Sequence, residues 1–130
     1  MPTEFSVILR DEPGTLARLG GALGGAGVNI EAISGSSRDG TSRVQFVCNA
    51  PDLATERLEA AGIPYATREV LLVRILDEPG TLGDVALVMW KAGINIDSVY
   101  VTTRGHVVLG VDDLAGAIQV AGGMAVMTPD

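Results

Sequence analysis

Two patterns of apolar residues alternate along the chain, and each predicts one kind of element. Short apolar runs at residues 5–9 and 70–76 predict strands. A few residues after each run, apolar side chains recur at i, i+3 and i+7, the spacing of one helix face. These positions are Leu16, Leu19 and Leu23, and then Leu82, Val85 and Met89. Each half of the chain is therefore expected to open with a strand and an amphipathic helix.

Proline and glycine mark the ends of these two helices. Pro13 and Pro79 precede the apolar face, where a missing backbone N–H costs nothing. Gly27 and Gly93 follow it and can adopt the left-handed conformation that ends a helix. The pattern thus predicts both boundaries of each helix.

A hairpin is predicted after each helix. In the first half, two extended runs flank Asp39-Gly40, a strong signal for a two-residue turn. In the second half, the turn is predicted at Arg104-Gly105 and the return strand at residues 106–111.

Second helices are predicted to begin near Pro51-Asp52-Leu53 and Asp113-Leu114, with the aspartates available as N-caps. Glycines at 62 and 122–123 end them, and short strands at 64–68 and 124–128 close the two halves. The order strand, helix, strand, strand, helix, strand is that of the ferredoxin-like split βαβ unit. The expected class is α+β: two βαββαβ units, each an antiparallel sheet with helices packed on one face.

The two halves are copies of one unit. The hexamer Asp-Glu-Pro-Gly-Thr-Leu, which we call the DEPGTL motif, occupies residues 11–16 and again 77–82. The same offset of 66 residues relates Ala-Gly-Val-Asn-Ile at 26–30 to Ala-Gly-Ile-Asn-Ile at 92–96. The domains are therefore expected at 1–68 and 69–130. Because a unit of this size is marginal alone, we expect the copies to share a continuous sheet or helical layer.

Composition narrows the function classes. The 130 residues are 47% hydrophobic with few aromatics, and the net charge of −7 disfavours binding to nucleic acid or to an anionic membrane surface. The single cysteine, Cys48, lies in an apolar run and is expected to be a small buried residue. With no visible signal peptide and no apolar stretch long enough to span a bilayer, a cytoplasmic location is expected.

The DEPGTL motif joins a strand end to a helix start, which brings free backbone N–H groups and a positive dipole end to one point. Gly14 and Gly80 let a ligand approach the backbone, and Asp11 and Asp77 place a carboxylate beside an anion site. This combination suits a zwitterion. The alternative is ordinary turn and capping chemistry, which also explains Asn29 and Asn95 after the helix ends.

The remaining motifs give little information about function. The glycine-rich stretch at residues 20–27 fits no nucleotide-binding fingerprint; close packing of a flat helix face is favoured, and a mobile helix is the alternative. His106 has no second metal-ligand neighbour, so no metal or other cofactor is expected. Pairs such as Asp112-Asp113 and Glu31/Asp97 are interpreted as caps and solvated strand positions, and no nucleophile–base pair is visible.

The chain resembles the ACT domain over both copies, through a strand, the DEPGTL motif and an amphipathic helix ending in Ala-Gly-Val-Asn-Ile. That family supplies amino-acid-sensing regulatory modules to aspartate kinase, phosphoglycerate dehydrogenase and their relatives. The resemblance implies ligand contacts at six residues. They are Asp11, Gly14 and Asn29, and Asp77, Gly80 and Asn95. It also implies that the loop of one unit faces the Asn of the other: Asp11 and Gly14 with Asn95, Asp77 and Gly80 with Asn29.

The motif departs from the phosphoglycerate-dehydrogenase subgroup, which often has Asn preceded by His two residues earlier. Here Asp11 follows Leu9, and Asp77 follows Ile75. An anionic side chain changes the charge of the site, which weighs against serine and leaves larger or apolar amino acids open.

Three hypotheses follow. The leading one is a stand-alone regulatory protein, not an enzyme, that binds an amino acid between its units, forms a homodimer and reports to an enzyme partner. The second is an assembly module without a live ligand site, which associates through its sheet edges. The third is a small enzyme of ferredoxin-like fold.

Overall fold

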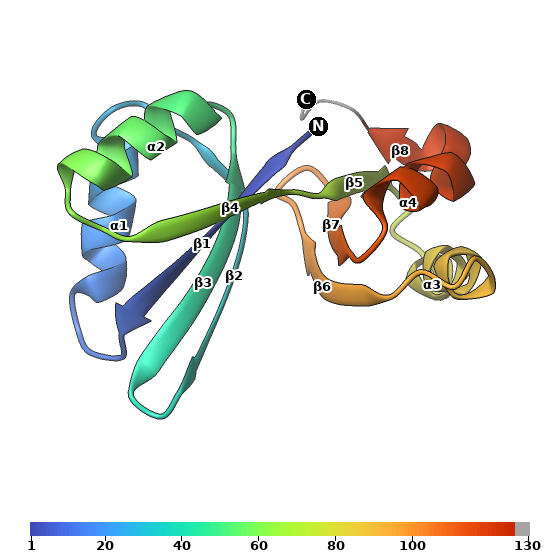
Figure 1. The fold of residues 1–130 in the computed structure, drawn as a ribbon, viewed down its shortest axis with the longest axis horizontal. Helices are drawn as coiled ribbons and strands as arrows, with labels where there is room; N and C mark the ends of the chain where they lie inside the picture. Colours follow the sequence, from blue (N-terminus) through green and yellow to red (C-terminus); the bar gives the residue numbers. More distant parts are fainter. Residues whose placement is uncertain (127–130) are drawn as a thin grey trace. The chain divides into compact units, whose positions relative to one another are not determined.

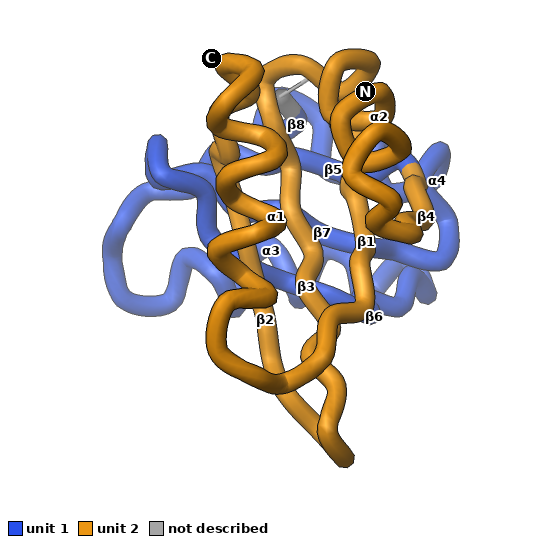
Figure 2. The backbone as a smooth tube through the Cα atoms, turned by 90° about the vertical axis from the view of Figure 1, so that its left-hand side faces the viewer, with its two compact units in different colours: residues 1–2, 69–130 blue, residues 3–68 orange. Residues whose placement is uncertain are grey.

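The computed structural model describes residues 1–126, and these form two compact units. The N-terminal unit comprises residues 3–68, and the C-terminal unit comprises residues 1–2 with the chain from residue 69 onward (Figure 2). Each is an α+β unit of ferredoxin-like βαββαβ order, which confirms the predicted fold class.

The N-terminal unit follows the predicted order of elements closely (Figure 1). Its elements are β1 (Thr3–Arg10), α1 (Thr15–Gly24), β2 (Ile30–Arg38), β3 (Thr41–Cys48), α2 (Pro51–Ala60) and β4 (Tyr65–Glu69). The sheet has the order β2-β3-β1-β4, so β2 and β4 are its edges. In Figure 2, α1 covers the β2 side of this sheet and α2 covers the β4 side.

The C-terminal unit repeats this order with shorter strands. Its elements are β5 (Leu71–Arg74), α3 (Thr81–Lys91), β6 (Ile96–Val101), β7 (His106–Val111), α4 (Leu114–Ala121), the 3₁₀ turn η1 (Gly122–Met124) and β8 (Ala125–Val126). The sheet order is β6-β7-β5-β8, with β6 and β8 at the edges. The last strand was predicted at 124–128, and residues 127 and 128 lie outside the described residues.

The described strands form two four-stranded sheets, so of the two expected arrangements, a continuous sheet or a helical layer, the continuous sheet is wrong. The reason is topological. β4 is an edge strand of the first sheet, whereas β5 pairs with β7 and β8 inside the second. The chain therefore changes sheet within the single residue between β4 and β5.

Each unit has its own core at the helix-covered face of its sheet. In the N-terminal core, Phe5 and Phe46 are neighbours across β1 and β3, and their rings stack with centroids 5.1 Å apart. The corresponding neighbours across β5 and β7 are Leu71 and Leu109. Cys48 is buried in the N-terminal core, as predicted.

Most turn predictions are confirmed. Asp39 and Gly40 both have positive φ, 53° and 82°, as the expected two-residue turn requires. Gly27 and Gly93 are left-handed, with φ of 80° and 72°.

The glycine-rich stretch behaves differently from its prediction. Gly20, Gly21 and Gly24 lie within α1 and are exposed, and a Cβ added at any of them would meet nothing within 4 Å. The expected close packing is therefore wrong for the described part of the chain. The reason is that Leu19 and Leu23 point into the core, which turns the glycine flank toward solvent.

Among the described residues, no helix combines the length and the apolar character needed to span a bilayer.

Candidate functional site

Both copies of the DEPGTL motif form the same strand-to-helix loop. Gly14 and Gly80 are the N-cap residues, with φ of 93° and 91°, a conformation that glycine adopts without strain. No side chain caps either helix. Asp11 and Asp77 therefore do not cap these helices, so the alternative capping role is wrong. The proline of each motif directly precedes the N-cap glycine and does not lie in the first helical turn.

A threonine that the sequence interpretation missed holds each loop in shape. The hydroxyl of Thr15 donates to the carbonyls of Arg10 (2.8 Å) and Glu12 (3.2 Å). In the second copy, Thr81 donates to Leu76 (2.6 Å) and Glu78 (3.0 Å). The threonine occurs at the same position in both copies of the motif, and this repetition could have pointed to its role. The threonine ties the loop back to the strand end, which leaves the first turn of the helix open.

These loops offer donors without a competing cap. The first N–H groups of any helix lack intrahelical partners, and the helix dipole adds partial positive charge there. Asp11, Gly14, Asp77 and Gly80 are all exposed. Each loop can therefore hold a carboxylate on backbone N–H groups and place a side-chain carboxylate nearby for an ammonium group.

The two asparagines that follow the first helix of each unit, Asn29 and Asn95, are held in place through their backbones. The N–H of Asn29 donates to the side-chain oxygen of Asn49 (2.9 Å), and its carbonyl accepts from the Asn49 N–H (3.1 Å). Asn95 makes the same pair of bonds with Asp112, at 3.0 and 3.2 Å. This fixes the backbone and leaves both asparagine side chains exposed. Asn49 and Asp112 are positioning residues that the sequence interpretation did not single out.

Within one unit, the aspartate and the asparagine lie far apart. Asp11 precedes α1 and Asn29 follows it, and a ten-residue helix is about 15 Å long. β1 and β2 both run antiparallel to β3, so Asp11 and Asn29 lie at opposite ends of the sheet as well. One amino acid cannot reach both residues of a single copy.

Two hollows flank the first loop. One, of about 350 Å³, lies against Leu9, Leu16 and Ile33 and includes Thr15. The other, of about 500 Å³, is lined by loop residues with Arg10 and Arg18. Asp11 lines neither hollow.

The charges beside the two loops differ. Arg18 donates to the carbonyl of Ala61 at the end of α2, and it lines the larger hollow together with Arg10. At the offset of 66 residues, these arginines correspond to Leu76 and Asp84. The first loop therefore has a cationic flank that the second lacks.

Of the remaining candidates, Asp113 caps α4 by accepting from the Gly116 N–H (3.0 Å), as predicted. Asp52 lies inside the first turn of α2, because the chain enters this helix at Ala50. Glu31 is buried, which corrects its interpretation as a solvated position. Among residues 1–126, no cluster of three or more His, Cys, Asp or Glu side chains could hold a metal ion.

Comparison with known proteins supports the family resemblance for the N-terminal unit. The sequence model of the ACT domain matches residues 3–61. No curated protein matches the chain. The match covers most of the N-terminal unit, and it confirms the resemblance carried there by the first DEPGTL motif.

Solved structures extend the likeness to both units. Protein BT0572 from Bacteroides thetaiotaomicron has a TM-score of 0.84 at 19% identity, over 91% of this chain and 84% of that chain. The ligand-free regulatory subunit of aspartate kinase from Thermus thermophilus has a TM-score of 0.70 at 17% identity, over 92% and 89%. Its counterpart from Thermus flavus scores 0.68 at 17% identity, over 92% and 90%. At these identities the likeness is one of fold.

Proposed function

We propose that this chain is a regulatory protein that binds an amino acid and acts on a partner enzyme. The observation that carries the proposal is the pair of uncapped helix N-termini at Gly14 and Gly80. Each has an exposed aspartate three residues earlier, so each presents complementary groups to a zwitterion. The ACT domain at residues 3–61 and the fold of aspartate kinase regulatory subunits support a regulatory role without catalysis.

We further propose that the six predicted residues form two crossed sites. Asp11 and Asn29 lie at opposite ends of α1, so a ligand that contacts both kinds of residue must take them from different copies. This supports the arrangement that the family resemblance implies. One site would comprise Asp11, Gly14 and Asn95, and the other Asp77, Gly80 and Asn29.

Calorimetric titration of the whole chain with each of the twenty amino acids tests the function. We expect saturable binding of at least one, and Asn95→Ala should weaken it at one site by about fivefold or more, because an unpaired polar group costs about 1–3 kcal/mol. Gln119→Ala, which removes an exposed amide from α4, is the matched control and should bind as the wild type does. No binding at millimolar concentrations would contradict the proposal and favour the assembly module.

Two double variants test whether each site takes its residues from both copies. Asp11→Ala with Asn95→Ala should damage one site and leave one ligand bound per chain. Asp11→Ala with Asn29→Ala should damage both sites. The reverse pattern of stoichiometries would show that each site draws both residues from one copy.

A further inference from the structure

One of the two hollows beside the first DEPGTL motif is lined by two arginines, and we call it the arginine hollow. Its volume of about 500 Å³ lies within the usual range of small-molecule sites, about 300–1,000 Å³. Arg10 comes from the end of β1 and Arg18 from α1. Gly14, the N-cap residue at which a ligand carboxylate is proposed to bind, lines the same hollow. A ligand held at this loop therefore has a cationic space beside it.

The guanidinium group of Arg18 is held in place by α2. One of its terminal nitrogens donates to the carbonyl of Ala61, the C-cap residue of that helix. A guanidinium group has five N–H donors in a planar arrangement, so a single bond to a carbonyl leaves most of them for an anion. Because the Ala61 bond fixes the group before a ligand arrives, less side-chain entropy is lost when an anion binds. Arg18 is thus suited to bind a carboxylate as well as to cap α2.

The charges of the first loop are balanced. Asp11 and Glu12 contribute two carboxylates, and Arg10 and Arg18 contribute two guanidinium groups. Glu12 lines the arginine hollow together with both arginines, whereas Asp11 does not line it. The hollow itself therefore has a net positive charge, and Asp11 remains available for the ammonium group of a ligand.

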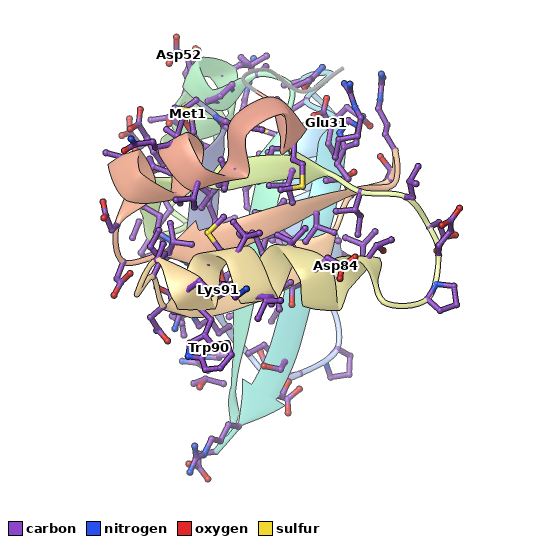
Figure 3. The ribbon with its side chains drawn as sticks, turned by 90° about the vertical axis from the view of Figure 1, so that its right-hand side faces the viewer. Met1, Glu31, Asp52, Asp84, Trp90 and Lys91 are labelled. Carbon is purple, nitrogen blue, oxygen red and sulfur yellow. The ribbon has the colours of Figure 1, made fainter. Side chains whose placement is uncertain are left out.

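The second loop has a different charge at the same place. Leu76 and Asp84 stand where the first copy has Arg10 and Arg18, and the motif repeats its two carboxylates at residues 77 and 78. Asp84 lies in the first turn of α3, beside this loop (Figure 3). Arg74, at the place of Ile8, adds one positive charge against these three carboxylates. An anionic side chain that the first loop attracts is therefore repelled by the second.

We propose that the site at the first loop takes an amino acid with an acidic side chain, aspartate or glutamate. This rests on the proposed function, in which backbone N–H groups at Gly14 bind the α-carboxylate and Asp11 binds the ammonium group. The side-chain carboxylate then lies in the arginine hollow and accepts N–H bonds from Arg10 and Arg18. Such charge-assisted bonds are about twice as strong as bonds between neutral groups. The site at the second loop, by the same physics, excludes acidic amino acids.

The apolar hollow on the other side of the first loop provides the competing arrangement. It lies against Leu9, Leu16 and Ile33, so it suits an apolar side chain such as that of leucine. An acidic side chain gains from the two arginines only in the arginine hollow, whereas leucine gains only in the apolar one. The preferred ligand therefore reports which hollow receives the side chain.

Calorimetric titration of the whole chain with glutamate, aspartate, glutamine, asparagine and leucine tests the proposal. Each amide has nearly the size of its acid and lacks the charge. We expect an acidic amino acid to bind at one site per chain, about tenfold or more tighter than its amide, because bonds between charged groups are stronger by about that margin. An amide or leucine that binds as tightly as the acids would overturn this inference and leave the proposed function standing. If none of the twenty amino acids binds, the proposed function fails with it.

Substitutions separate the effect of charge from that of structure. Arg18→Gln should remove most of the preference for the acid over its amide, whereas Arg57→Gln, at an exposed position in the last turn of α2, should keep it. The ratio of the two affinities is the readout, because loss of the Ala61 bond alone would weaken acid and amide alike. Circular dichroism shows whether each variant is folded. An unchanged ratio in Arg18→Gln would overturn the proposal.

A gain of binding tests the same argument in the second copy. The double variant Leu76→Arg with Asp84→Arg gives this loop the two arginines of the first. We expect it to bind two acidic amino acids per chain where the wild type binds one. A single acidic site in the folded double variant would contradict charge as the reason for the difference between the loops.

Discussion

The two copies of the repeat agree where the backbone needs a particular residue and differ where a surface or a core can vary. Gly14 and Gly80 have nearly the same positive φ and identical motif neighbours. By contrast, Gly24 of α1 corresponds to Trp90 of α3, and both positions are exposed. The difference teaches that the two units share one loop geometry, whereas the exposed flanks of α1 and α3 carry very different side chains.

The cores differ in the same way. The stacked pair Phe5–Phe46 in one unit is replaced by Leu71 and Leu109 at the same place in the other. Each pair lies within a separate hydrophobic cluster. The fold therefore depends on filling the space between sheet and helices, and either aromatic or aliphatic side chains fill it.

The largest expected effect comes from a core substitution that destabilises one unit and leaves the other unit unchanged. Phe46→Ala should destabilise the N-terminal unit by about 3–5 kcal/mol, because it removes a fully buried ring and leaves a cavity. Amide hydrogen exchange read by mass spectrometry should speed up in β3 and stay slow in β7. Leu109→Ala should give the opposite pattern. Equal acceleration in both strands after either change would mean that the cores unfold together.

A smaller effect should be equal in the two copies. Gly14→Ala and Gly80→Ala should each cost about 1–2 kcal/mol, since an alanine at their positive φ is strained. Gly20→Ala, which installs the residue found at the matching position of α3, should instead stabilise by up to about 1 kcal/mol. Urea unfolding measures all three. A neutral Gly14→Ala would contradict the left-handed geometry of the loop.

The smallest expected effect is a change of folding stability with pH. Burial raises the pKa of the Cys48 thiol, and the nearby carboxylate of Glu31 adds to this. The unfolded thiol ionises at a lower pH, at about 8.5. The stability that Cys48 contributes is therefore complete below that pH and declines as the pH rises through the higher folded pKa.

Cys48→Val tests this, because valine occupies the matching place at residue 111, opposite Ile96 as Cys48 is opposite Ile30. Urea unfolding at pH 7 and pH 9.5 should show a smaller loss of stability for the variant than for the wild type. An identical loss would assign the pH dependence to other groups.

Much of the fold was predictable because it rests on local chemistry. Asp39-Gly40 sets a two-residue turn, and apolar spacing sets the core faces of α1 and α3. Capping was less predictable. Asp113 caps its helix, but Asp52 does not, because Pro51 already occupies the first position of α2.

For the candidate site, the sequence predicted the loops and the asparagines as ligand contacts but did not predict which residues hold them in place. The hydroxyl of Thr15 reaches back five residues to Arg10, and the Asn95 backbone is held by Asp112 from the next strand end. Such contacts depend on how loops and strand ends meet in space, which spacing along the chain does not encode.

The sequence by itself determined the internal repeat and the order of elements, because periodicity and turn chemistry act over a few residues, and its repeated motifs gave the resemblance to the ACT domain. Only the tertiary structure decided which flank of each helix faces solvent. It turned Gly20, Gly21 and Gly24 from an expected packing surface into an exposed one, since burial depends on which side of a helix the sheet and its neighbour cover.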